Sequence, residues 1–245
     1  MMHRRTEAIN FQGRSGQLKG TIEYPARENP RAVAVFAHCF ACGRNSLAAV
    51  RIARLLADCG IATLRFDFAG IGESEGQFGE TGLLGNADDI VAATSALAEN
   101  GLPCNLLIGH SYGGAAAIAA ASQIPTVRNL VTIGAPFEVD HVLKTVGADQ
   151  DRIEQEGSMV LSILGREAVI TDEFVKQASN EGQRQRIAEL DVRLLILHAQ
   201  DDGIVPYEQG ERLFLAARRE KDFVTLKGAD HLLTAPDSAQ QVSSL

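Results

Sequence analysis

The sequence predicts a single α/β domain whose central sheet is mostly parallel and is covered by helices on both faces. From Ala32 onward, short apolar segments alternate with helical patterns, and continuously apolar strands are typical of a parallel sheet buried on both sides. The length of 245 residues is enough for one substantial core and leaves little room for a second domain. We therefore expect one domain over residues 1–245.

The elements begin with two short alternating segments, 8–11 and 18–24, separated by a turn that contains glycine. They indicate an antiparallel hairpin at one edge of the sheet. The later elements are predicted as strands at 32–37, 61–66, 104–109, 127–133, 194–198 and 223–226, and helices at about 47–58 and 83–99. A last helix is expected to begin near Asp237 or Ser238.

A long excursion, 137–190, interrupts this alternation between two successive core strands. Within it, the segments 158–164 and 167–170 around Gly165 suggest a small hairpin, and a helix is expected to start at Asp172. Long excursions inside a compact fold are usually functional lids. We therefore expect a cap, or lid, over a substrate pocket. The alternative is a structural extension that does not touch substrate.

The most specific motif is Gly109-His110-Ser111-Tyr112-Gly113-Gly114, which lies between an apolar run and an alanine-rich helix. A serine in a G-x-S-x-G motif sits on a tight strand-to-helix turn that exposes its hydroxyl at the helix N-terminus. A serine hydroxyl is a weak nucleophile at neutral pH, so it needs a histidine to take its proton and an acid to orient that histidine. Ser111 is therefore a candidate nucleophile.

Asp202 and His231 are the candidate partners of Ser111. Asp202 lies in the turn after the strand at 194–198, and His231 lies in the loop after the strand at 223–226. Only His231 among the candidate bases follows the last strand. The alternatives are Asp201 for the acid and His198 or His110 for the base.

Taken together, these segments resemble the α/β-hydrolase superfamily almost from end to end. The order Ser, Asp, His, each just after a strand, is the order of that superfamily. The segment 33–40 is similar to its strand and His-Gly-Phe loop, and 65–76 is similar to its D-x-x-G-x-G-x-S loop. The position of Asp202 before Val205-Pro206 resembles the superfamily's D-x-x-V-P turn.

In more detail, the chain is similar to the hydrolase half of bifunctional bacterial proteins that fuse this domain to an OsmC-like, peroxidase-type domain. The similar features are His-Cys-Phe at 38–40, Ile-Gly-Ala-Pro-Phe at 133–137 and Ala-Asp-His-Leu-Leu-Thr at 229–234. The resemblance implies an OsmC-like domain or protein as a partner, and a terminal helix longer than the one expected here. No OsmC-like segment follows within the 245 residues.

The resemblance also implies roles around the nucleophile. The backbone N–H groups of Phe40 and Tyr112 are expected to form the oxyanion hole. His38 is expected to hydrogen-bond to backbone near the site, and Asp67 and Ser74 are expected to organise their own loop. Such a catalytic triad needs no cofactor and no metal.

Composition disfavours several classes of protein. A net charge of −8 argues against a surface that binds nucleic acid or an anionic membrane. No run approaches the roughly 18 apolar residues of a membrane span, and the N-terminus has no apolar signal-peptide core. We therefore expect a cytoplasmic protein, either a monomer or a homodimer.

The four cysteines, Cys39, Cys42, Cys59 and Cys104, are too few and too dispersed for a secreted disulfide framework, so we expect them to be reduced. The C-x-x-C spacing at 39–42 can mark a metal or redox pair. No second pair has zinc spacing, which favours a packing role. The alternative is that oxidation or alkylation of Cys39 switches off the enzyme.

These features predict a serine hydrolase of the carboxylesterase type (EC 3.1.1) that cleaves a small-molecule ester of short to medium chain length through an acyl-enzyme on Ser111. The same triad serves thioesterases and acyltransferases. A third alternative is a binding or regulatory module for an OsmC-like partner.

Overall fold

A mixed sheet forms the centre of the computed structural model, which describes residues 5–26, 29–40, 42–163, 166–178 and 180–244. Its strand order is β1-β2-β4-β3-β5-β6-β9-β10. The hairpin of β1 (Arg5–Gly13) and β2 (Gly16–Tyr24) lies at one edge, and β2 is antiparallel to β4. The remaining neighbours in this sheet pair in parallel, which confirms the mostly parallel sheet.

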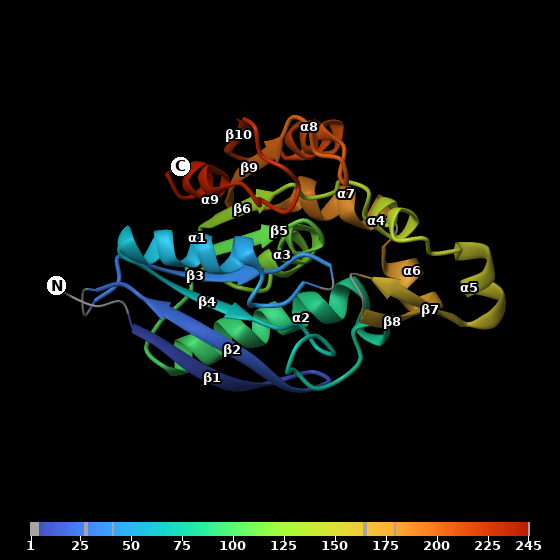
Figure 1. Ribbon diagram of the computed structural model, residues 1–245, viewed down its shortest axis with the longest axis horizontal. Coiled ribbons are helices and arrows are strands. Elements are labelled where there is room, and N and C mark those ends of the chain that lie inside the picture. The colour runs from blue at the N-terminus through green and yellow to red at the C-terminus, as the bar shows by residue number, and fades with distance from the viewer. Residues whose placement is uncertain (1–4, 27–28, 41, 164–165, 179, 245) are drawn as a thin grey trace.

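Helices cover both faces of the sheet (Figure 1). The other strands of the sheet are β3 (Ala32–Ala37), β4 (Ile61–Phe66), β5 (Leu106–His110), β6 (Asn129–Ile133), β9 (Arg193–Ala199) and β10 (Lys221–Leu226). Helices α1 (Leu47–Asp58) and α9 (Pro236–Ser243) pack on one face. Helices α2 (Phe78–Glu99), α3 (Tyr112–Ala121) and α8 (Tyr207–Ala216) pack on the other face.

Strand β3 illustrates why the core strands read as continuous apolar runs. Val33 and Val35 belong to the core under α2 and α3, whereas Ala34 and Phe36 belong to the core under α1 and α9. Successive side chains of a strand point to opposite faces, so a strand that is covered on both faces needs apolar residues at every position.

Between β6 and β9 the chain leaves the sheet and forms a separate group of elements, which we call the insertion. It contains α4 (Val139–Thr145), α5 (Gln150–Glu156), β7 (Ser158–Ile163), β8 (Arg166–Thr171), α6 (Asp172–Gln177) and α7 (Asn180–Glu189). The predicted hairpin is the antiparallel pair β7–β8, although Leu164 and Gly165 at its turn lie outside the described residues. In Figure 1, α5, β7, β8 and α6 lie beside one end of the sheet.

The structure differs from the sequence prediction in its helices. Helices α4, α5, α7 and α8 were not predicted. Helix α2 begins at Phe78, earlier than predicted, because a kink at Gly82 separates its first turn from the rest. Gly82 has φ +61° and ψ −171°, and the Oε1 atom of Gln177 accepts the Leu84 N–H just beyond the kink at 3.0 Å. Over the described part of the chain, no helix is both long and apolar enough to cross a membrane.

Candidate active site

Ser111 lies on a sharp turn between β5 and α3 and has a strained backbone. Its φ of 55° and ψ of −124° lie in a region that residues with a side chain rarely adopt. The turn is fixed by two backbone hydrogen bonds, from Ser111 N–H to the Ile133 carbonyl and from Gly114 N–H to the Ser111 carbonyl, both at 2.8 Å. Strain of this kind is typical of functional sites, where the surrounding structure maintains it.

Glycines allow this turn to pack closely. A methyl group on Gly109 would lie 2.4 Å from the Gly113 carbonyl oxygen, and one on Gly113 would lie 2.4 Å from the carbonyl oxygens of Ala37 and His38. Atoms cannot approach so closely, so the backbones of β5, α3 and the end of β3 require glycine here. This geometry is the strand-turn-helix context expected of a G-x-S-x-G motif.

The structure brings Ser111, His231 and Asp202 into one hydrogen-bonded chain. The Ser111 Oγ atom is 2.9 Å from Nε2 of His231, and Nδ1 of His231 is 2.8 Å from Oδ2 of Asp202. The other carboxylate oxygen, Oδ1, accepts the N–H groups of Ile204 at 2.9 Å and Val205 at 2.8 Å. Both oxygens of Asp202 are therefore held, and Asp201 is exposed and outside this chain.

The environment keeps Asp202 ionised. Burial would raise its pKa, but the hydrogen bond and charge of His231 and the two backbone N–H donors outweigh burial, and the pKa is lowered below the usual aspartate value. An ionised carboxylate next to Nδ1 favours the tautomer with its proton on Nδ1. The Nε2 atom is then free to accept a proton from Ser111.

The two alternative histidines occupy supporting positions. His198 is buried and its Nε2 donates to the Val205 carbonyl at 2.9 Å, which secures the turn that carries Asp202. His110 is buried directly before Ser111 in the chain, and its Nε2 donates to the His231 carbonyl at 2.7 Å. Burial lowers the pKa of both side chains, that of His110 to about 4. Neither is hydrogen-bonded to Ser111 in the described structure.

Phe40 and Tyr112, the predicted oxyanion-hole residues, lie on the two segments that meet at Ser111. Tyr112 is the first residue of α3, and Phe40 follows the end of β3. Their rings meet edge to face with centroids 5.1 Å apart, and both also contact Phe78 and Phe174. This cluster fixes the loop after β3 relative to the start of α3.

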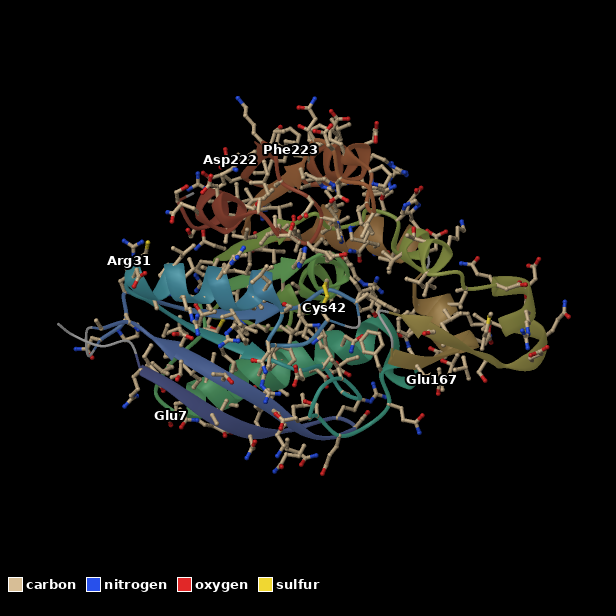
Figure 2. The ribbon with its side chains drawn as sticks, in the orientation of Figure 1. Glu7, Arg31, Cys42, Glu167, Asp222 and Phe223 are labelled. Atoms are coloured by element: carbon tan, nitrogen blue, oxygen red, sulfur yellow. A yellow bond between two sulfur atoms is a disulfide. The ribbon has the colours of Figure 1, made fainter. Side chains whose placement is uncertain are left out.

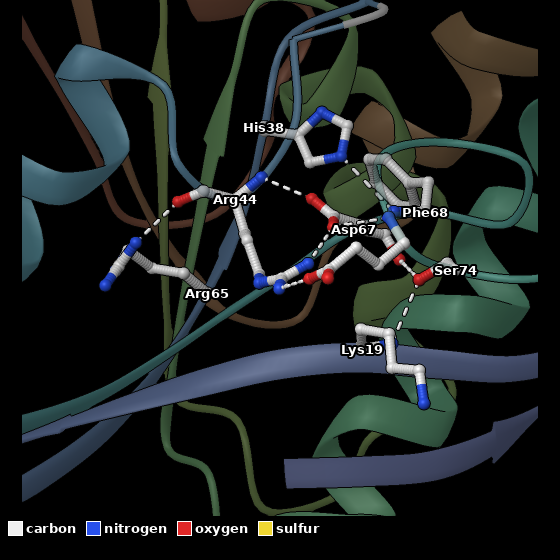
Figure 3. A network of polar contacts seen from close by, with 8 residues as sticks. Lys19, His38, Arg44, Arg65, Asp67, Phe68 and Ser74 are labelled. Carbon is white, nitrogen blue, oxygen red and sulfur yellow. Dashed lines mark hydrogen bonds and ion pairs between the residues drawn. The ribbon is translucent and has the colours of Figure 1, made fainter. Parts of the chain in front are cut away.

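A second network holds the loops behind the site (Figure 3). The Nε2 atom of His38 accepts the Phe68 N–H at 3.2 Å, and its Nδ1 donates to the Cys39 carbonyl at 2.7 Å. The Asp67 carboxylate accepts the Arg44 N–H at 2.6 Å and pairs with the Arg44 guanidinium. Ser74 Oγ donates to the Asp67 carbonyl at 2.7 Å. His38, Asp67 and Ser74 thus make the kind of loop contacts that were expected of them.

A cavity of 370 Å³ opens beside Ser111 and His231. Its walls come from the loop after β3, from α4 and β7 of the insertion, and from Ile204 and Leu232. The described lining residues include no Asp, Glu, Lys or Arg. In the described part of the chain, no group of three or more His, Cys, Asp or Glu side chains is arranged to hold a metal ion.

A larger cavity, of 590 Å³, lies over the sheet between α1 and α9. Ser111, Asp202 and His231 do not line it. It borders residues at the amino ends of the parallel strands, such as Asn105 and Asn129, whereas ligands of such sheets bind at the carboxyl ends. The smaller cavity is therefore the candidate substrate site.

The expectation of four reduced cysteines is wrong for two of them. Cys39 and Cys42 form a disulfide across the loop after β3, with Cα atoms 5.4 Å apart (Figure 2). The Cys42 N–H donates to the Cys39 carbonyl at 3.1 Å, and this turn brings the side chains within the usual range for a disulfide. Both cysteines line the 370 Å³ cavity. Cys59 and Cys104 are free.

Sequence reasoning missed two features of the site. Gly134, at the end of β6, has φ +54°, and a methyl group on it would lie 3.2 Å from Oδ2 of Asp202 and 3.4 Å from Nδ1 of His231. The second feature is Asn86, whose Oδ1 accepts a hydrogen bond from the Tyr112 hydroxyl at 3.0 Å. The position of Gly134 directly after a central strand was visible in the sequence, whereas no pattern indicated Asn86.

Comparison with known proteins agrees with this geometry. A family model described as serine aminopeptidase, S33 (Hydrolase_4), matches residues 28–166. The esterase domain of a Rhodothermus marinus protein is 35% identical, with a TM-score of 0.79 over 98% of this chain and 95% of that chain. Est1E from Butyrivibrio proteoclasticus, solved with ferulic acid bound, is 20% identical and has the same fold, with a TM-score of 0.83 over 97% of this chain and 95% of that chain.

A curated relative from Mus musculus, "Palmitoyl-protein thioesterase ABHD10, mitochondrial", is 27% identical over 197 residues, which are 76% of this chain and 64% of that protein. The family model covers more than half of the chain and includes the loop after β3 and the strand-turn-helix around Ser111. The chain therefore belongs to the serine aminopeptidase S33 family of hydrolases, within the α/β-hydrolase superfamily.

Proposed function

We propose that this protein is a serine carboxylesterase that cleaves short- to medium-chain esters through an acyl-enzyme on Ser111. The observation that carries the proposal is the hydrogen-bonded chain from Ser111 Oγ through His231 to Asp202, with distances of 2.9 and 2.8 Å, beside an uncharged cavity. His231 takes the hydroxyl proton as Ser111 attacks the ester carbonyl, and it returns that proton to the leaving alcohol. Water then hydrolyses the acyl-enzyme by the same route.

In this proposal, the Phe40 and Tyr112 N–H groups stabilise the oxyanion of the tetrahedral intermediate. Tyr112 stands at the N-terminus of α3, where unpaired N–H groups and the helix dipole favour negative charge. One such donor typically accounts for about 10² to 10³ in rate. Because the donors are backbone groups, a substitution at Phe40 would act by moving the loop.

The cavity supports a preference for a small, uncharged acyl or alcohol group. Its 370 Å³ lies at the small end of the roughly 300–1,000 Å³ of ligand sites. Val142 of α4, Val146 directly after α4 and Leu232 beside His231 present apolar surface to it. The insertion thus supplies part of the wall, which supports the proposed role as a cap.

The test combines active-site labelling with ester turnover. A fluorophosphonate should label the wild type at Ser111, and Ser111→Ala should not be labelled and should lose about 10⁴- to 10⁶-fold in kcat on p-nitrophenyl butyrate. Across a series of p-nitrophenyl esters from acetate to palmitate, kcat/KM should peak at short or medium chains. Folded wild-type protein with neither labelling nor turnover would overturn the proposal.

A thioesterase is the second candidate, because one relative is named as a palmitoyl-protein thioesterase. The same acyl-enzyme forms from a thioester, and an alcohol in place of water would make the protein an acyltransferase. Parallel assays with butyrate esters and thioesters distinguish an esterase from a thioesterase. Product analysis in the presence of glycerol detects an acyltransferase.

A relationship to OsmC-like fusions, or a binding role with such a partner, is a proposal that rests on the sequence resemblance alone.

A further inference from the structure

The Cys39–Cys42 disulfide lies in the wall of the candidate substrate cavity, and the mechanism above makes no use of it. Figure 2 labels Cys42 on the loop between β3 and α1. Cys39, Phe40 and Cys42 line the same 370 Å³ cavity as Ser111 and His231. The two cysteines enclose Phe40, whose N–H is the proposed oxyanion donor from this loop.

We propose that Cys39 and Cys42 form a thiol–disulfide exchange site for a small or protein dithiol, and that its reduction lowers the reactivity of Ser111. This inference rests on the proposed esterase function for its activity measurement. The exchange itself is independent of that function.

The loop is anchored on both sides of the disulfide, and across it the Cys42 N–H donates one backbone hydrogen bond, of 3.1 Å, to the Cys39 carbonyl. On the N-terminal side, His38 holds the Cys39 carbonyl, and the Phe40 ring packs against Tyr112. On the C-terminal side, Arg44 is tied to Asp67 by its N–H and its guanidinium. The disulfide adds a covalent cross-link between these two anchored flanks.

The two sulfur atoms differ in accessibility. Cys39 is only 4% exposed, whereas Cys42 is half-buried and faces the cavity. A dithiol that enters this cavity therefore attacks Cys42 first. Its thiolate forms a mixed disulfide with Cys42, and Cys39 leaves as a thiolate and takes up a proton. The second thiol of the reagent then displaces Cys42, which leaves two protein thiols and an oxidised, cyclic or paired, reagent.

Reduction changes the shape of the cavity wall. Two unbonded sulfur atoms need more room than a bonded pair, and close packing around buried Cys39 limits movement on that side. The displacement therefore falls on Cys42 and on the loop segment toward the cavity. A misplacement of about 1 Å near a catalytic group can cost about 10² in rate. Because the Phe40 ring remains packed, we expect a smaller loss, of about ten-fold, in the rate of Ser111 labelling and in kcat.

The other cysteines give an internal reference for the thiol count. Burial raises the pKa of Cys104 to about 11, and Cys59 is exposed at the end of α1. Neither lines the candidate substrate cavity. Alkylation under denaturing conditions should find two thiols in the oxidised protein, four after treatment with dithiothreitol, and two again after reoxidation.

The experiment uses the full chain in both redox states, with the reductant removed anaerobically before assay. It measures the fluorophosphonate labelling rate, the kcat on p-nitrophenyl butyrate, and hydrogen exchange of a peptide spanning 38–46. The wild type should lose about ten-fold in the first two on reduction, recover on reoxidation, and exchange faster in this peptide when reduced. The double variant Cys39→Ala/Cys42→Ala should not respond to dithiol, and Cys59→Ser should respond like the wild type.

Three results would overturn the inference. The first is four alkylatable thiols in protein that has never been reduced. The second is a change of less than two-fold in labelling and kcat between the two states. The third is unchanged exchange in the peptide 38–46. If neither state labels or turns over ester, the esterase proposal fails, and the thiol count and the exchange data still decide whether the disulfide controls this loop.

Discussion

The backbone of Ser111 is strained because its neighbours leave no relaxed alternative. The hydrogen bond to Ile133 and the close contacts at Gly109 and Gly113 force a positive φ on a residue that carries a side chain. A serine hydroxyl at this position is needed for nucleophilic attack, so the strain is a stability cost linked to the proposed function. Glycine is the residue that adopts such a backbone readily.

Ser111→Gly should therefore be more stable than Ser111→Ala by about 1 kcal/mol, the reverse of the usual order for these two residues in a helix. Urea unfolding of both variants measures the difference. Ser122, at the other end of α3 with φ −68°, provides the matched pair, and there the alanine variant should be the more stable. An alanine variant at 111 as stable as the glycine variant would show that the turn is not strained.

Gly134 approaches the hydrogen-bonded pair of Asp202 and His231 so closely that a methyl group would disturb it. Gly134→Ala places a Cβ atom 3.2 Å from Oδ2 of Asp202, tighter than an ordinary contact, and should reduce kcat about ten-fold by tilting the carboxylate. Gly101→Ala is the control, because Gly101 also has a positive φ, +74°, but a methyl group there meets nothing within 4 Å. Both variants should lose similar stability in thermal unfolding. Full kcat for folded Gly134→Ala would contradict this prediction.

At the scale of elements, the insertion is fixed to the core at several points. Thr171 Oγ1, which caps α6, donates to the Gly79 carbonyl at 3.0 Å, and Gln177 of α6 accepts the Leu84 N–H. At its other end, Gln209 of α8 accepts the N–H groups of Phe137 and Glu138 at 2.9 and 2.8 Å. The contacts favour an insertion that stays docked during catalysis.

Gly79 allows β8 to lie against the start of α2, because a methyl group there would lie 1.2 Å from the Val169 carbonyl oxygen. Gly79→Ala should therefore displace β8, lower the free energy of unfolding by about 2 kcal/mol, and raise KM, since β7 contributes to the cavity. Hydrogen exchange should accelerate in β7, β8 and α6.

Gly182→Ala serves as the control within the insertion. Its nearest atoms belong to the flexible Arg186 side chain at 3.3 Å, and alanine favours the α7 helix. This variant should match or exceed the wild type in stability. Unchanged exchange of β7 and β8 in Gly79→Ala would show that the insertion is docked by other contacts.

The sequence predicted the core strands and, within the insertion, the β7–β8 hairpin and the start of α6, but it missed helices α4, α5 and α7, for a physical reason. Strands such as β3 are apolar at every position because both faces are buried, and this pattern is local. Helix α7 has mostly polar residues, and it is held by buried Gln183 and Ile187 against the core, a tertiary contact that leaves no periodic pattern. The Cys39–Cys42 disulfide was missed because four dispersed cysteines were expected to be reduced. The turn that brings these two side chains together decides the pairing.

Three buried ionisable groups make the stability of the whole molecule depend on pH in opposite directions. Burial raises the pKa of Asp89 to about 6, although the Ala69 N–H, at 2.9 Å, favours its charged form. Burial lowers the pKa of His110 to about 4 and also lowers that of His198. The histidines bind protons less readily when folded, so they destabilise the fold as pH falls from about 6.5. Asp89 acts in the opposite sense.

Asp89 binds its proton more readily in the folded state than in the unfolded chain, where an aspartate has a pKa of about 4. Its contribution to stability is therefore fully present below about pH 4 and is lost as pH rises to about 6, by up to about 3 kcal/mol. Asp89→Asn removes this titration. The free energy of unfolding of the variant, relative to that of the wild type, should therefore rise between pH 4 and 7. Any effect of the amide that does not depend on pH shifts the whole curve and leaves this rise unchanged. The partly exposed neighbour Asp88, paired with Arg14 at 3.0 Å, provides the control, and Asp88→Asn should change this pH dependence far less. Urea unfolding of the three proteins at pH 4, 5, 6 and 7 measures the difference, and parallel curves for Asp89→Asn and the wild type would mean that folding does not raise the pKa of Asp89.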